Sequence, residues 1–209
     1  MFTNMAINLD KIISRISSYN ANLLPVVKNK SIQEIKFIYD LNFRDFGENR
    51  LIDFYEHSSK YKDVNYHFIA PIQSRKLKEI CKNFTHIHTI SRLKEIEIIK
   101  KLEYKGDFFI QMNLDNDPNK SGINEKILYK ILHSCIEKNI FPSGLMTIPN
   151  IKSDPKNIYS RMQKINNDIK KEYDFYKGEL SMGMSGDYEV ALDYGATIVR
   201  IGTKLFNNV

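Results

Sequence analysis

Short runs of Ile, Val, Phe and Leu alternate along the whole chain with longer amphipathic stretches, and this alternation limits the fold more than any other feature. Such a pattern is typical of successive βα units, in which helices connect parallel strands. A helix at about Ile7–Ser18 is expected to precede the first strand. Eight strands are expected, near Leu23–Lys28, Arg44–Phe46, Tyr66–Ala70, His86–Thr89, Phe108–Leu114, Gly144–Ile148, Glu179–Met182 and Thr197–Ile201.

Eight βα units predict an α/β fold in which the sheet closes into a (β/α)8 barrel of the TIM type. An open doubly wound sheet more often stops at about five or six strands. A dinucleotide-binding sheet would also carry GxGxxG after its first strand, where this chain has Lys28-Asn29-Lys30-Ser31. Because no linker rich in Pro, Gly or Ser divides the sequence, residues 1–209 are expected to form a single domain.

The charge pattern, the cysteine spacing and the N-terminal segment argue against a nucleic-acid-binding, a metal-binding and a membrane protein, respectively. The chain has 31 Lys+Arg against 25 Asp+Glu, but the lysines are interleaved with glutamates and no RNA-binding aromatic signature occurs, so no nucleic-acid partner is expected. Cys81 and Cys135 are far apart and belong to no metal-binding pattern, which indicates reduced, buried thiols. The N-terminus lacks the apolar stretch of a signal peptide or membrane span, which predicts a cytoplasmic protein without a membrane partner.

The first candidate site residue is Lys28. Barrel sites are built where the strands end and the following loops begin, and Lys28 ends the apolar run LLPVVK. A strand buried on both faces would partly desolvate the ammonium group, and a desolvated lysine is a good nucleophile. A solvated lysine at the start of a loop is the simpler alternative, and Lys30 is the nearest competitor.

The last two expected strands end in runs that suit an anion. SMGMSGD begins at Ser181 and RIGT begins at Arg200. Small residues let backbone N–H groups approach a phosphate, hydroxyls add donors, and barrels commonly bind phosphate at these two strands. The glycines could instead only form turns, with Ser185 or Asp187 capping a helix, and both roles can hold together. A phosphate site opposite a lysine favours pyridoxal 5′-phosphate (PLP), which needs one anion site and one amine.

Seven segments of the chain match a known family in their order and spacing: LLPVVKNKSIQEI, RDFGEN, HFIAPIQSRK, IHTISRLKEIE, QMNLDNDPNKSGI, GLMTIP and LSMGMSGDYEVALDYGATIVRIGTKLFN. Through them the chain resembles, over nearly its full length, the PLP homeostasis family, whose members were formerly called proline synthetase co-transcribed proteins. The resemblance implies an alanine racemase-like barrel that carries PLP in vitamin B6 balance, without established catalytic turnover. It further implies a monomer, with PLP-dependent apo-enzymes as candidate recipients.

The resemblance also assigns roles to individual residues. It implies that Lys28, in VVKNK, holds the cofactor as a Schiff base. Asn49, in RDFGEN, would line the cofactor ring, although a helix cap is its simpler role. Ser181, Gly202 and Thr203 would bind the phosphate, the last two through backbone N–H groups.

Arg200 matches the residue that faces the pyridine nitrogen in the family. Arginine only donates hydrogen bonds, so it leaves that nitrogen unprotonated and the ring a poor electron sink. Carbanion chemistry such as transamination is therefore disfavoured. An amino-acid racemase of the same fold is the alternative, because racemases tolerate arginine there. The resemblance implies that they also need a tyrosine from a further C-terminal domain, for which a chain ending at Val209 is not expected to have room.

Three of the five histidines lie in the expected strands, and the chain departs from the family pattern in two places. His86 and His88 share one strand face, but no third metal ligand is evident, and His67 is expected to be a hydrogen-bonded core residue. The region before the first strand is shorter than usual in the family. The residues that depart from the family pattern in HFIAPIQSRK are Ala70, Pro71 and Arg75.

Overall fold

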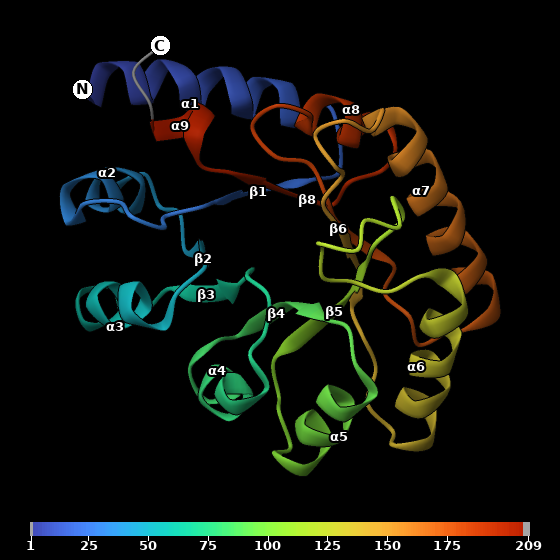
Figure 1. Ribbon diagram of the computed structural model, residues 1–209. Helices are drawn as coiled ribbons and strands as arrows, with labels where there is room; N and C mark the ends of the chain where they lie inside the picture. The colour runs from blue at the N-terminus through green and yellow to red at the C-terminus, as the bar shows by residue number, and fades with distance from the viewer. Residues whose placement is uncertain (1, 207–209) are drawn as a thin grey trace.

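The computed structural model describes residues 2–206, and eight parallel strands in it form one sheet curved into a barrel with helices outside (Figure 1). Neighbouring strands follow the order β1-β8-β7-β6-β5-β4-β3-β2. The expected (β/α)8 barrel with an additional N-terminal helix is thus confirmed. The strands are β1 (Asn22–Pro25), β2 (Asp45–Glu48), β3 (Asn65–Phe68), β4 (His86–Ile90), β5 (Asp107–Met112), β6 (Gly144–Thr147), β7 (Glu179–Ser181) and β8 (Ile198–Ile201).

Helices connect the strands on the outside of the barrel. Helix α1 buries residues spaced three or four apart, including Met5, Leu9 and Ile12, and it packs against α9, which brings both ends of the described chain together (Figure 1). The helices are α1 (Phe2–Ile16), α2 (Ile32–Asp40), α3 (Leu51–Lys60), α4 (Leu77–Asn83), α5 (Leu93–Lys101), α6 (Glu125–Glu137), α7 (Pro155–Glu172), α8 (Tyr188–Asp193) and α9 (Thr203–Phe206), with a 3-10 turn η1 (Ser74–Lys76) before α4.

The barrel closes between β1 and β2 through a single bridge that pairs Val26 with Gly47. The N–H of Val27 donates to the carbonyl of Gly47 at 3.0 Å. A Cβ at Gly47 would stand 3.2 Å from the side chain of Ile69, so glycine leaves room for this residue, which follows β3. The seam between β1 and β2 lies directly before Lys28.

Apolar packing occurs on both sides of the sheet. The larger core fills the space between the strands and the helices, whereas a small cluster of Leu24, Phe109, Met146 and Ile198 lies inside the barrel. The rest of the barrel interior is unusually polar, because His67, His88, Ser181 and Arg200 are also buried there. Their partners are described below.

The ends of several elements differ from the sequence-based expectation. β1 ends at Pro25, so Lys28 lies in a turn beyond the strand, where the N–H of Lys30 donates to the carbonyl of Val27 at 3.1 Å. β2 continues through Gly47 to Glu48 because that segment pairs with β3. Among the described helices, none is long and apolar enough to cross a membrane.

Candidate functional site

A pocket of about 370 Å³ lies where the strands end at the C-terminal mouth of the barrel. It gathers residues from segments far apart in the sequence, as expected for a barrel site. Every residue predicted to bind the cofactor lines it except Ser181. The lining residues are Val26, Lys28, Asn49, Ile69, Ile148, Met184, Ser185, Gly186, Arg200, Gly202 and Thr203.

Lys28 is exposed at the edge of this pocket, in the turn between β1 and α2. The expected desolvation of its ammonium group is wrong, because the buried strand ends before the turn that carries it. The turn is well defined: Asn29 has a φ of 56°, and Ser31 forms a capping box with Glu34 at the start of α2. The backbone, rather than burial, therefore holds Lys28 at the pocket.

The competing lysine, Lys30, is engaged elsewhere. Its ammonium lies 3.3 Å from a carboxylate oxygen of Glu34 and 4.9 Å from the ring centre of Phe206. Lys30 does not line the pocket, whereas Lys28 does. The structure therefore distinguishes two lysines that the sequence could not separate with certainty.

The loops after β7 and β8, next to β1 in the barrel, form a rim of the pocket beside Lys28. The hydroxyl oxygen of Ser185 accepts from the backbone N–H of Lys204 at 3.1 Å, which joins the two loops and leaves the hydroxyl proton available to a ligand. Apart from its chain neighbours, no atom of residues 2–206 lies within 4 Å of the position a Cβ would take at Gly186, so space remains for a ligand group. Gly202 and Thr203 complete the rim.

Ser181 lies below this rim and does not line the pocket. Its side chain is fully buried, and its hydroxyl oxygen accepts a hydrogen bond from Nη1 of Arg200 at 2.7 Å. Gly183, with a φ of 93°, turns the chain after β7 and brings Ser185 to the rim instead. The sequence contained Ser185, but the residue pattern did not show which serine the turn would expose.

Arg200 forms the base of the pocket and is only 3% exposed. Besides Ser181, it donates from Nη2 to the carbonyl of Thr147 at 3.0 Å. Burial disfavours the charged form and lowers the pKa of Arg200 to about 10, so the guanidinium remains charged at neutral pH. With Lys28, it makes the pocket favourable for an anion.

Asn49 also lines the pocket and lies directly after β2. It is not the N-cap of α3, since Arg50 takes that position. Its amide oxygen is buried without a hydrogen-bond partner within the described chain, which is a costly state that a ligand donor would relieve. The adjacent Glu48 accepts from Nδ1 of the buried His57 at 2.5 Å, and this contact fixes the end of β2.

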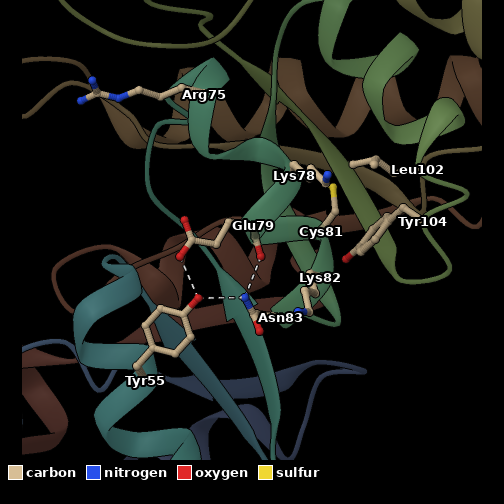
Figure 2. Close-up of a pocket in the computed structure, with 9 residues that line it drawn as sticks. All are labelled: Tyr55, Arg75, Lys78, Glu79, Cys81, Lys82, Asn83, Leu102 and Tyr104. Carbon is tan, nitrogen blue, oxygen red and sulfur yellow. Dashed lines mark hydrogen bonds between the residues drawn. The ribbon is translucent and has the colours of Figure 1, made fainter.

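A larger pocket of about 640 Å³ lies outside the barrel, around α4 (Figure 2). The hydroxyl of Tyr55 donates to Glu79 at 2.7 Å, and Asn83 donates to that hydroxyl at 3.2 Å. Burial raises the pKa of the Cys81 thiol to about 12, so this cysteine is a poor nucleophile. Arg75, one of the departures from the family pattern, lies at this pocket and so away from Lys28.

The three histidines lie together inside the barrel. His67 is hydrogen-bonded to His88 at 3.0 Å and to Asp45 at 3.1 Å, which confirms its expected role as a hydrogen-bonded core residue. His86 stacks on His67 with 3.8 Å between ring centres. Within residues 2–206, no group of three His, Cys, Asp or Glu side chains is placed to hold a metal ion.

The fold and the pocket together define a (β/α)8 barrel with a pocket at its mouth that is lined by Lys28 and Arg200. Among solved structures, the chain is similar to PipY of Synechococcus elongatus without PLP, with a TM-score of 0.88 and 26% identity over 97% of this chain and 100% of PipY. PipY has also been solved with PLP bound, and that structure gives the same TM-score at 23% identity. Alanine racemase of Clostridium difficile shares the fold at 15% identity and a TM-score of 0.78, over 99% of this chain and 57% of the racemase.

Curated relatives give the family. The chain is 34% identical over 200 residues to the pyridoxal phosphate homeostasis protein of Synechocystis, covering 90% of this chain and 92% of the relative. It is 32% identical over 196 residues to the protein of the same name from Aquifex aeolicus, covering 89% and 86%. A scan against protein-family models gives no match. The chain belongs to the pyridoxal phosphate homeostasis protein family.

Proposed function

We propose that residues 1–209 act as one domain that binds PLP, holds it as a Schiff base on Lys28, and carries it in the cytoplasm as a monomer. The observation that carries the proposal is that Lys28 and the anion-binding rim line one pocket at the mouth of the barrel. PLP-dependent apo-enzymes are the proposed recipients, and neither nucleic acid nor a membrane is required as a partner.

The residues of the pocket suit the parts of PLP. Ser185, Gly186, Gly202 and Thr203 offer hydroxyls and small residues for the phosphate. Arg200 presents a donor-only group to the ring nitrogen from the base of the pocket. PLP supplies an aldehyde that reacts with amines, and Lys28 is the amine at the edge of the pocket.

Two observations support a carrier rather than an enzyme. The curated relatives carry the name homeostasis protein. Arg200 would leave the ring nitrogen unprotonated, which weakens the electron withdrawal that most PLP enzymes use. Release of the cofactor needs only hydrolysis or exchange of the imine with another amine, and exposure of Lys28 to solvent favours both.

The proposal is tested by titrating the purified protein with PLP and scanning the visible spectrum. We expect a Schiff-base band in the wild-type protein that is lost in Lys28→Ala. Lys30→Ala is the matched control, because Lys30 lies two residues away and is paired with Glu34, and it should retain the band. A band that persists in Lys28→Ala would refute the assignment.

A further inference from the structure

A continuous chain of hydrogen bonds runs through the barrel from Arg200 to its opposite end. Arg200 contacts Ser181 at 2.7 Å, and Ser181 contacts Nδ1 of His88 at 2.7 Å. Nε2 of His88 lies 3.0 Å from Nδ1 of His67, and Nε2 of His67 lies 3.1 Å from Asp45. β7 and β4 are separated in the sheet by β6 and β5, so the contact between Ser181 and His88 crosses the barrel interior.

The two ends of this row of hydrogen bonds fix the direction of every bond in it when both imidazoles are neutral, because a serine oxygen could otherwise accept from both of its neighbours. Arginine can only donate and an ionised carboxylate can only accept. Ser181 therefore accepts from Arg200 and has its one proton to donate to Nδ1 of His88. His88 is then protonated on Nε2 and donates to His67, which in turn is protonated on Nε2 and donates to Asp45. This assignment requires both imidazoles to be neutral.

The surroundings of His88 favour its neutral form. His88 is fully buried and stacks on Phe109 with 4.5 Å between ring centres. Burial and the neighbouring His67 and Arg200 lower the pKa of His88 well below its ordinary value. A protonated His88 would place a second cation close to Arg200 in the barrel interior.

Arg200 needs such a chain because it is a buried cation without a carboxylate partner. Within residues 2–206, no Asp or Glu oxygen contacts its guanidinium directly, its two acceptors are neutral, and Asp187 acts on its charge only from a longer distance. A carboxylate in direct contact would cancel the charge that faces the pocket. A row of aligned dipoles ending at Asp45 stabilises the guanidinium while leaving its charge available to an anionic ligand.

We propose that Ser181 and His88, supported by His67 and Asp45, are positioning residues that fix the orientation of the Arg200 guanidinium at the base of the pocket. The role of Arg200 toward the pyridine ring rests on the proposed function. The protonation pattern of the hydrogen-bonded histidines does not depend on that function. Asp45 and His67, at the far end of the row of hydrogen bonds, line a separate pocket of about 420 Å³. A change in the hydrogen bonds of these two residues would therefore be transmitted to Arg200 through the barrel interior.

The protonation pattern is tested by ¹⁵N NMR of the imidazole nitrogens in the ligand-free protein. We expect Nδ1 of both His88 and His67 to be unprotonated acceptors and Nε2 of both to carry the proton. In Ser181→Ala, the Nδ1 resonance of His88 should move toward that of a nitrogen without a donor. A proton on Nδ1 of either ring in the wild-type protein would overturn the proposal.

The positioning role is tested by PLP affinity. Ser181→Ala should weaken binding about tenfold while the visible band of the bound cofactor remains, because Lys28 is unchanged. Ser181→Thr restores a hydroxyl and should recover most of the affinity. Thr89→Val is the matched control: Thr89 is buried beside His88, but its hydroxyl donates only to the carbonyl of Ala70, so affinity should not change. Unchanged affinity in Ser181→Ala would overturn the positioning role.

Two further results can be told apart: a Ser181→Ala variant that does not fold, and a wild-type protein that does not bind PLP. If Ser181→Ala fails to fold, Asp45→Asn tests the chain from its half-exposed end and should shift the Nε2 resonance of His67 without loss of structure. If the wild-type protein does not bind PLP at all, the proposed function fails. The NMR result for His67 and His88 then still decides whether the chain of hydrogen bonds exists.

Discussion

At the scale of single residues, the two glycines after β7 have different physical roles. Gly183 has a φ of 93°, and a Cβ there would stand 2.7 Å from the Cβ of Ala191. Gly186 lines the pocket, and its Cβ position has no neighbour within 4 Å in the described part of the chain beyond the adjacent residues. Gly183 therefore shapes the loop, whereas Gly186 keeps the pocket open.

Replacement of each glycine by alanine should separate these roles. Gly183→Ala should lower the free energy of unfolding by about 2 to 4 kcal/mol, because it combines a left-handed backbone with close packing. Gly186→Ala should change stability by less than about 0.5 kcal/mol. Gly186→Ala should nevertheless weaken PLP binding, because its methyl group would occupy the rim. Chemical denaturation and PLP titration of both variants measure the two effects, and equal stability losses would contradict this account.

At the scale of elements, two histidines of β4, His86 and His88, make the stability of the fold depend on pH in the acid range. Burial, together with His67, lowers the pKa of His86 from 6.5 to about 4, although Asp107 acts in the opposite direction. The pKa of His88 is lowered in the same sense. A histidine whose pKa is lower in the folded state stabilises the fold above its unfolded pKa, and this stabilisation is lost as the pH falls toward the folded pKa.

The free energy of unfolding should therefore fall between pH 6.5 and about 4, with about 3 kcal/mol of the loss due to His86. Urea denaturation across this range should show a flatter pH dependence in His86→Gln than in the wild-type protein. His133→Gln, on the exposed surface of α6, is the control and should keep the wild-type slope. An unchanged slope in His86→Gln would show that folding does not lower the pKa of this histidine.

At the scale of the whole molecule, the candidate cofactor lysine lies beside the seam where β1 meets β2 and the barrel closes. Lys28 follows the segment in which β1 meets β2 through Val26 and Gly47, and Asn49 follows β2 on the other side. A ligand that contacts both Lys28 and Asn49 would join the two strands across this seam. Binding and barrel closure are therefore expected to support each other.

The sequence predicted the barrel and most of the pocket because these depend on local signals. Hydrophobic periodicity located the eight strands, and strand ends located Lys28 and Arg200. The place of Ser181 could not be predicted, because the turn at Gly183 decides which serine reaches the rim. The contact between Ser181 and His88 joins residues 93 positions apart and leaves no local pattern.

The most direct test of the account is to treat the PLP-loaded protein with borohydride and to map the product by peptide mass spectrometry. Reduction makes the bond between the cofactor and its lysine permanent, so the modified residue is identified together with the cofactor. The account predicts pyridoxyl phosphate on Lys28 alone. Modification of Lys30 or another lysine in place of Lys28, or no modification, would contradict it.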